Sequence, residues 1–473
     1  MVERKTSESG QAMVLLVLSF IVLLGFTALA IDGSMVYADR RHEQNAADTG
    51  SLAGANAAAM YLENYYVNYE DYELNDIDSD GDLDCVSSDP IIVDKLNAAL
   101  DAAEAASISR VGSNDYTIDT DISDDNGVYA ACGGKDNGTW IDKYIDVTTT
   151  VTADTRTNFV HLIYTGPVRN TVTAVTRVRP RSPLGLGNAI VALREECQGN
   201  DGGVTFDGGI IVDVIGGGIF SNACLDANGQ SVDVTAGSIS CTYYPDQGQS
   251  DCYTNPSGGP VTPNPVEGTV PLPRQAFYIP PPDCSQVPLS TYHNNDTEIF
   301  PGRYERISVN AGDSVLLHPG LYCIDDPGPQ TGDFVVNGGG RVYTNPNEGV
   351  TLYITEGNFL VTGAQNVGNI QLEAPPNPDN YTCIGCPPAI PGVLIYLAEG
   401  NTGSVDILGD STSYFRGTVY APDGTINVGG GSIPVVEAQV IGDTVKVHGN
   451  TNWNVIYVSD LLYSPPAYME VAK

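Results

Sequence analysis

The chain has 473 residues, of which 58 are acidic and 21 are basic, so its formal net charge is −37. This charge repels phosphate backbones and argues against a nucleic-acid partner, while a hydrophobic content of 42% excludes a disordered acidic tail. The 52 Gly, 30 Pro and 26 Tyr residues point instead to turn-rich β structure.

The first predicted element is the segment Met13–Ile31, which contains neither a charged residue nor a proline. At ~1.5 Å per residue it would extend about 29 Å, close to the thickness of a bilayer core. A signal peptide cleaved near Ala28–Ala30 is the alternative, but the apolar run is long for a signal sequence. We therefore predict that residues 1–32 form a short N-terminus and a single transmembrane helix.

Charge counting does not set the orientation of this span, because Arg4 and Lys5 precede it and Arg40 and Arg41 follow it. Cysteine usage does, because all ten Cys residues lie at or after Cys85 and suit an oxidising compartment. We expect the N-terminus to be cytoplasmic and the bulk of the chain to be extracytoplasmic, in a single-pass protein of the cell membrane.

Helix-forming residues continue beyond the span, and a stripe of small residues runs along one face of the predicted helix. Such a stripe allows very close packing against another helix or a sheet, although helix propensity alone also explains the many alanines. The stripe consists of Ala46, Gly50, Ala53, Gly54 and Ala57.

A specific set of residues lies along this N-terminal stretch: Gly10, Gln11, Asp32, Tyr37, Arg40, Arg41, Gln44, Asn45, Ala46, Ala47, Asp48, Leu52, Ala53, Gly54 and Ala55. Through these residues the stretch resembles the Tad-like region of TadE/TadG-type Flp pilus-assembly proteins over about 50 residues. The resemblance implies a pilin-like anchor with a role in pilus assembly or adhesion. Leu15 stands where processed prepilins usually carry Glu, so we expect the span to be retained rather than cleaved.

Residues 33–184 are predicted to form a Tad/pilin-like α+β module. Its sequence indicates a helix over Pro90–Arg110 and alternating β-branched strands over Tyr144–Ala153 and Asn170–Arg179. A long helix laid on a small antiparallel sheet is also what the resemblance implies.

Five alternating aspartates in this module predict a calcium site, since calcium prefers oxygen ligands arranged around a tight glycine turn. Ser87 stands where an EF-hand loop carries its bidentate Glu, so we expect weak affinity. A solvated acidic turn is the alternative. The proposed ligands are Asp76, Asp78, Asp80, Asp82 and Asp84, and no organic cofactor is expected.

Two cysteines, Cys85 and Cys132, precede residue 185, and eight follow it. An even number in each part suits disulfide bonding within modules, so we predict that these two pair with each other. Cys383 and Cys386 form the only CxxC motif. We interpret them as disulfide candidates rather than zinc ligands, because no second close pair or HxxxH motif follows.

Residues 185–473 are predicted to form a Gly/Pro-rich, β-solenoid-like domain. Short apolar runs recur about every 8–14 residues between Gly, Asn, Asp or Pro, and the pattern persists without a restart. A β-sandwich is the alternative. Only Asn188–Glu196 suggests a helix here, and Pro256–Pro288 is interpreted as an extended excursion or linker.

The fold class is therefore mainly β, with a long N-terminal pilin-like helix. No HExxH, GxSxG, GxGxxG or P-loop motif is present, and we expect no enzymatic activity and no catalytic residue. We expect a TadG-like membrane-anchored surface protein that contacts pilus or cell-surface components. The alternative is an anchored polysaccharide-binding or polysaccharide-cleaving β-helix protein whose partners are surface glycans.

Overall fold

A computed structural model describes residues 9–472 and divides the chain into two compact units, which are treated separately below. Unit 1 contains residues up to Ser182 together with Pro466–Lys473, and unit 2 contains Pro183–Pro465. The described range omits residues 76–82, 119–125, 137–140, 161–163, 165, 186, 198–201, 230, 243–250, 257, 294–295, 326–331, 363–367, 377–388, 431–434 and 450–451.

Unit 1 combines two helices with a four-stranded antiparallel sheet of order β3-β4-β5-β31. The helices are α1 (Ser9–Asn64) and α2 (Pro90–Gly112), and a short turn of helix, η1 (Tyr69–Asp71), follows α1. The strands are β3 (Gly127–Asp136), β4 (Ile141–Thr155), β5 (Val168–Arg179) and β31 (Tyr468–Val471), and a separate hairpin pairs β1 (Glu73–Asn75) with β2 (Asp84–Val86).

The predicted elements of unit 1 are confirmed, and local chemistry explains their limits. Helix α2 starts where Asp89 accepts a hydrogen bond from the Ile91 N–H at 2.9 Å and Pro90 occupies the first turn. Strand β5 alternates between buried and partly exposed residues, as a one-sided sheet requires. Helix α1 continues without a break through Asp32 and Gly33.

The stripe of small residues lies in the interface of α1 with α2 and β4. A Cβ added at Gly50 would lie 2.5 Å from Val111 Cγ2 on α2. One added at Gly54 would lie 2.7 Å from the Ala103 carbonyl oxygen and 2.8 Å from Val147 Cγ1. The stripe therefore serves close packing and not helix propensity alone.

Unit 2 is a parallel solenoid, which confirms the predicted body and not the sandwich alternative. A first series of strands contains β6 (Asn188–Ala192), β7 (Val204–Gly208), β8 (Ile211–Ile215), β9 (Gly218–Ser221), β10 (Leu225–Ala227), β11 (Asp233–Thr235), β12 (Ile239–Cys241), β13 (Tyr253–Thr254), β14 (Val261–Thr262) and β15 (Val266–Glu267).

A second series completes the solenoid. It contains β16 (Glu298–Ile299), β17 (Gly302–Tyr304), β18 (Ile307–Val309), β19 (Ser314–Leu317), β20 (Gly320–Ile324), β21 (Phe334–Val336), β22 (Arg341–Tyr343), β23 (Val350–Ile354), β24 (Phe359–Val361), β25 (Asn369–Glu373), β26 (Val393–Leu397), β27 (Ser404–Ile407), β28 (Tyr414–Gly430), β29 (Val435–Gly449) and β30 (Asn452–Ile456), before a short η8 (Ser459–Leu461).

Through the first series, and in the second as far as the pairing of β25 with β28, a strand pairs in parallel with the strand three places later, so three strands make one coil. The long strands β28 and β29 span more than one such position, and β28 also pairs with β26, β27 and β29. Matching positions of successive coils stack in the interior: Ile307, Phe334 and Phe359 are in register and fully buried. The two phenyl rings lie 5.3 Å apart. This stacking of like side chains gives the solenoid one continuous apolar core.

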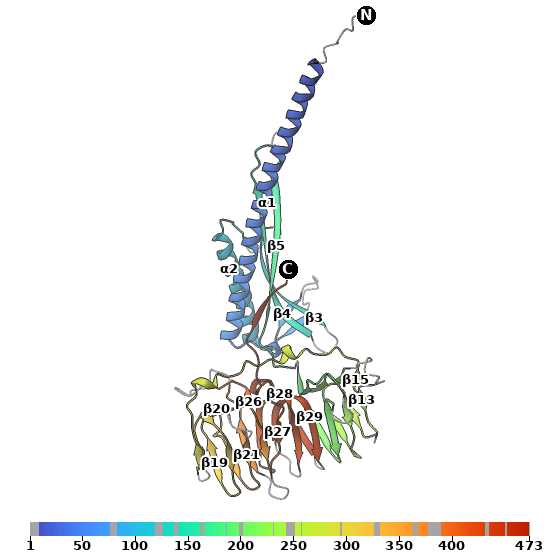
Figure 1. The fold of residues 1–473 in the computed structure, drawn as a ribbon, viewed down its shortest axis with the longest axis vertical. Coiled ribbons are helices and arrows are strands. Elements are labelled where there is room, and N and C mark those ends of the chain that lie inside the picture. Colours follow the sequence, from blue (N-terminus) through green and yellow to red (C-terminus); the bar gives the residue numbers. More distant parts are fainter. Residues whose placement is uncertain are drawn as a thin grey trace, which may run out of the picture. The chain divides into compact units, whose positions relative to one another are not determined.

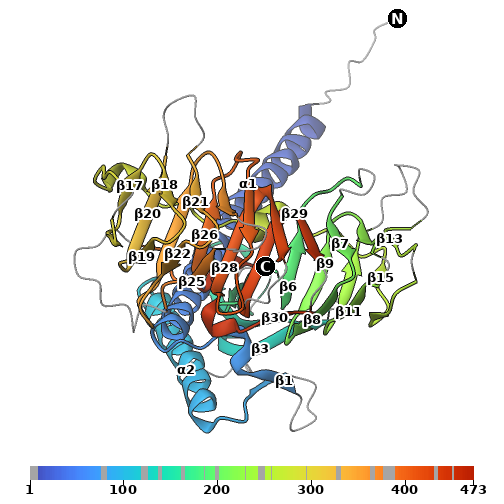
Figure 2. The ribbon, with the colours of Figure 1, turned by 90° about the horizontal axis from the view of Figure 1, so that it is seen from below.

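The chain enters and leaves the solenoid near its middle. Strand β29 pairs with β28 on one side and with β6 and β7 on the other, while β30 pairs with β8. The first series therefore winds outward from the centre to β15, and the second winds back inward from β16. Figure 2 shows β6, β28 and β29 near the middle, with β13 and β15 at one end and β17 and β19 at the other.

Residues 268–290, here called the strap, connect the two ends of the solenoid and contain the short helices η5 (Arg274–Phe277) and η6 (Cys284–Gln286). Phe277 and Ile279 are buried in a second apolar cluster outside the main core. The Asn222 side chain bonds the backbone of Leu272 in both directions at 2.8 Å. The predicted excursion is thus a packed part of unit 2.

Two sequence-based predictions need correction, one of an element and one of a boundary. Residues 188–192 form strand β6 rather than a helix, because β6 is paired on both sides by β29 and β9. The predicted body, 185–473, ends earlier, because β31 returns to pair with β5 in unit 1. The predicted boundary between module and body lies two residues from the observed one.

Candidate functional site

The apolar half of α1 is the most exposed hydrophobic surface in the described part of the chain. Its large side chains from Met13 to Phe26 are 52–72% exposed. A window of this helix has a mean hydropathy of 2.9 with none of it buried in the protein. A helix of this length and composition fits a single-pass membrane anchor, with lipid in contact with the exposed side chains.

Asp32 closes the apolar span and holds a second element in place. Its side chain is 1% exposed, and its carboxylate accepts hydrogen bonds from the backbone N–H groups of Asn158 (2.8 Å), Phe159 (2.9 Å) and Val160 (2.5 Å). Three charge-assisted bonds offset the cost of burying this carboxylate. The β4–β5 loop is thereby fixed to the helix residue that follows Ile31.

The residues that carry the family resemblance divide between two faces of α1. Tyr37, Arg40 and Arg41 are exposed, and the Arg41 guanidinium lies 5.9 Å from the Tyr37 ring. Ala46 and Ala47 are fully buried in the core of unit 1. The motif therefore contributes packing on one face and leaves an aromatic and basic face open for a partner.

The predicted calcium loop lies almost entirely outside the described residues, which exclude Asp76, Asp78, Asp80 and Asp82. Asp84 is described, as an exposed residue that opens β2 and pairs with Asn75 of β1. The Ser87 hydroxyl donates to the Asp71 carbonyl oxygen at 2.6 Å, so this twelfth-position side chain is already engaged. Calcium binding stays a prediction.

The structure joins Cys85 to Cys132 within unit 1, with their Cα atoms 5.6 Å apart. Unit 2 contains three further disulfides, none of them specified from the sequence: Cys197–Cys224, Cys241–Cys252 and Cys284–Cys323. Cys383 and Cys386 lie outside the described residues. Every described disulfide stays within one unit, and the described residues include no free cysteine.

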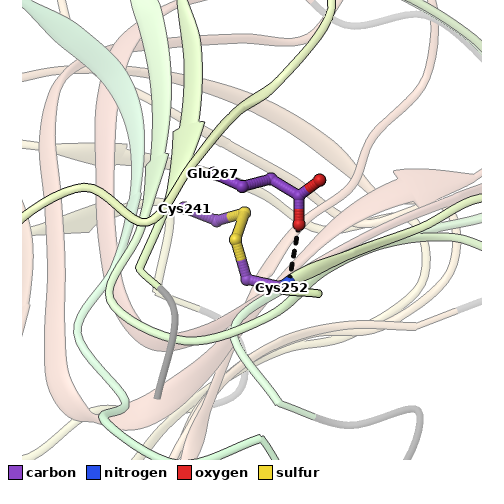
Figure 3. A group of neighbouring side chains, drawn as sticks. All are labelled: Cys241, Cys252 and Glu267. Carbon is purple, nitrogen blue, oxygen red and sulfur yellow. Dashed lines mark hydrogen bonds between the residues drawn. A yellow bond between two sulfur atoms is a disulfide. The ribbon is translucent and has the colours of Figure 1, made fainter. Parts of the chain in front are cut away.

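Figure 3 shows the one group of described residues whose donor atoms lie close enough together to suggest a metal site: Cys241, Cys252 and Glu267. The two sulfur atoms are bonded to each other, which removes the thiolates that would bind a metal. One Glu267 carboxylate oxygen accepts hydrogen bonds from the N–H groups of Cys252 (2.8 Å) and Tyr253 (3.2 Å). We interpret this group as a structural brace.

A hollow of about 260 Å³, here called the strap cleft, lies between the strap and the coils of unit 2. Sequence analysis missed it, because its residues come from segments far apart in the chain. Tyr353, Tyr396 and Tyr420 pack edge to face beneath it, with centroids 5.1 and 5.0 Å apart. Its lining includes Arg274, Tyr278, Tyr396, Glu399, Tyr420 and Asp423.

Charges in the strap cleft are mostly paired. Arg274 lies 2.6 Å from both Asp423 and Asp443, and the second Asp423 oxygen accepts from the Gly400 N–H at 2.7 Å. Burial raises the pKa of the Tyr396 phenol above its ordinary value, so this hydroxyl stays protonated and donates to the Ile279 carbonyl at 2.6 Å. Tyr278 is 53% exposed and available to a ligand.

Comparison with known proteins gives one match. Residues 10–57 match the family model of Tad, described as Flp pilus-assembly TadE/G-like. No curated protein and no solved structure was found to match the chain. The match covers the apolar helix and the small-residue stripe of α1, and it includes Asp32.

Proposed function

We propose that this chain is a TadG-like, membrane-anchored component of Flp pilus assembly with no enzymatic activity. The observation that carries the proposal is the family match over residues 10–57, which coincides with an exposed apolar helix of spanning length. Unit 2 would act as a spacer or adhesive surface, because a disulfide-braced solenoid presents a rigid, extended array of side chains.

The proposed topology places the N-terminus in the cytoplasm, and places unit 2 and the part of unit 1 that follows the span outside. The four disulfides among the described residues support this orientation, since such bonds persist in oxidising compartments. Proteolysis of intact spheroplasts should remove unit 2 and the part of unit 1 that follows the span, and leave only an N-terminal fragment protected. Protection of the chain after the span would reverse the orientation.

The role in pilus assembly is tested by deleting the gene in the native host and counting surface pili. Complementation should use the unmutated chain and the variant Arg40→Ala/Arg41→Ala, which changes only exposed residues of the matched segment. Loss of pili that only the unmutated chain restores would support the proposal. Normal piliation in the deletion strain would contradict it.

The strap cleft favours a second candidate function, the binding of surface glycans. Sugars stack on exposed tyrosines and bond to carboxylates, and this cleft offers Tyr278 beside the exposed Glu399. Binding is favoured over cleavage because Asp423 is occupied by Arg274 and the Gly400 N–H, so it is a poor partner for Glu399 in a catalytic pair. A glycan array probed with the unmutated chain and with the Tyr278→Ala variant tests this function. Equal binding signals for the two proteins would exclude the strap cleft as the glycan-binding site.

A further inference from the structure

The part of the β4–β5 loop that contacts Asp32, residues 158–160, lies at the level of the last turns of the apolar helix. Its residues Phe159 and Val160, with Leu24, Ala28 and Ile31 of α1, line an apolar groove of about 600 Å³. At ~1.5 Å per residue the stretch from Leu24 to Asp32 covers about 12 Å of helix, the part nearest to unit 1. Figure 1 shows β5 running beside α1.

The loop cannot easily leave this level, because Asp32 binds three consecutive backbone N–H groups of it. A membrane that surrounds Met13–Ile31 therefore also meets the loop. The groove is continuous with the lipid-facing side of the helix, since residues of the span form one of its walls.

The side chains that the loop exposes suit the boundary between lipid and water. Phe159 is 40% exposed and Tyr164 is 54% exposed. Aromatic residues concentrate at this boundary, where the ring lies against acyl chains and a phenol reaches the headgroups. Arg156, the first residue of the loop after β4, is also exposed and offers a cation for lipid phosphates.

We propose that the β4–β5 loop is a second membrane contact, in which Phe159, Val160 and Tyr164 insert among the lipids of the leaflet from which α1 emerges. This inference rests on the proposed anchoring by α1. Two contacts joined through Asp32 would hold unit 1 at a fixed height and rotation on the membrane, which a single helix does not achieve.

Tryptophan fluorescence of the full chain in phosphatidylcholine vesicles tests the contact. The variants Phe159→Trp and, independently, Tyr164→Trp should emit at shorter wavelength and be quenched by lipids brominated near the headgroup end of the acyl chains. Leu52→Trp is the matched control, because Leu52 is exposed on the same helix but about 30 Å beyond Ile31. The unmutated chain supplies the background of Trp140 and Trp453.

The outcomes separate the inference from the anchoring on which it rests. Quenching by aqueous acrylamide but not by brominated lipid, in protein that resists carbonate extraction, overturns the loop contact and leaves the anchoring intact. Protection from both quenchers also overturns it, because a second copy of the chain would then cover the groove. Release of the protein by carbonate overturns the anchoring and the inference together.

Discussion

Two buried carboxylates on α1 have opposite surroundings. Asp32 accepts three backbone hydrogen bonds, whereas one oxygen of Glu43 is buried with no hydrogen-bond partner among the described residues. Burial and the neighbouring Asp39 raise the pKa of Glu43 above its ordinary value. Asp32 therefore holds the β4–β5 loop against α1 through its hydrogen bonds, while Glu43 is a source of pH-dependent stability.

The Glu43→Gln variant should be more stable than the unmutated chain at pH 7. Because folding raises the pKa of Glu43 from 4.5, the folded state binds more protons, and its stability falls as the pH rises through the folded value. The neutral amide removes this dependence, so the two proteins should converge below the unfolded pKa, near pH ~4. Thermal unfolding in detergent at both pH values measures the difference.

Glu70→Gln, which changes an exposed carboxylate of unit 1, is the control. It should change the melting temperature little at pH 7 and at the lower pH. A Glu43→Gln variant that is less stable at pH 7 would show that the hydrogen bond between Glu43 and Asn170 outweighs the desolvation.

Calcium at the β1–β2 loop stays a prediction. Millimolar calcium should stabilise the full chain by ~1–2 kcal/mol relative to chelator, as expected for a dissociation constant on the order of 10⁻⁴–10⁻³ M. The variant Asp78→Ala/Asp80→Ala should lose this increment. The full chain is required, because β31 completes the sheet of the unit that carries the loop. Equal melting temperatures in calcium and chelator would leave a solvated acidic turn.

At the scale of elements, the sequence predicts what depends on local pattern. The apolar span, α2, β4 and β5 were predictable because caps, β-branched alternation and hydrophobic length act within a few residues. The helix suggested over Asn188–Glu196 was wrong because pairing with β9 and β29 outweighs local propensity. A solenoid was predictable from its recurrence, but the order of its coils was not.

Gly54→Ala tests the packing of α1. Its new methyl group would lie 2.7 Å from the Ala103 carbonyl oxygen, so we expect a loss of about 1–3 kcal/mol in the free energy of unfolding. Gly33→Ala is the matched control on the same helix, where a Cβ would meet nothing within 4 Å. The control should be neutral or more stable by about 0.5–1 kcal/mol. Similar melting temperatures for both variants would mean that the interface between α1 and α2 adjusts to accept the added methyl group.

At the scale of the whole molecule, the candidate sites also divide into those that a local sequence pattern predicts and those that depend on distant contacts. The anchor could be predicted, because its signal is contiguous. The partner of Asp32 could not, since Asn158–Val160 reach it only through the β4–β5 hairpin, and the strap cleft depends on contacts between distant coils. The pairing of Cys284 with Cys323 was likewise open, because eight cysteines after residue 185 allow many connectivities.

Replacing Cys284 and Cys323 by Ala should release the strap. The lost bond closes a loop with a sequence separation of 39, for which chain entropy predicts a cost of about 3–4 kcal/mol. We expect a lower melting temperature and new protease cleavage near Phe277, which is buried while the strap is docked. Reducing agent added to the variant should then change strap cleavage no further. Unchanged cleavage in the variant would show that the Asn222 and Tyr396 contacts suffice to hold the strap.

Entry of the chain at the middle of the solenoid also sets the timing of folding. Strands β6, β7 and β8 are synthesised early, yet their partners β29 and β30 come after almost the whole of unit 2. The sheet of unit 1 is likewise completed only after β31 has been synthesised. Until then the nascent chain exposes unpaired edges of the parallel sheet. Such edges pair readily with other chains, so we expect export to require a chaperone. An mRNA truncated before the codons for β29 would thus yield an aggregation-prone fragment instead of a smaller functional protein.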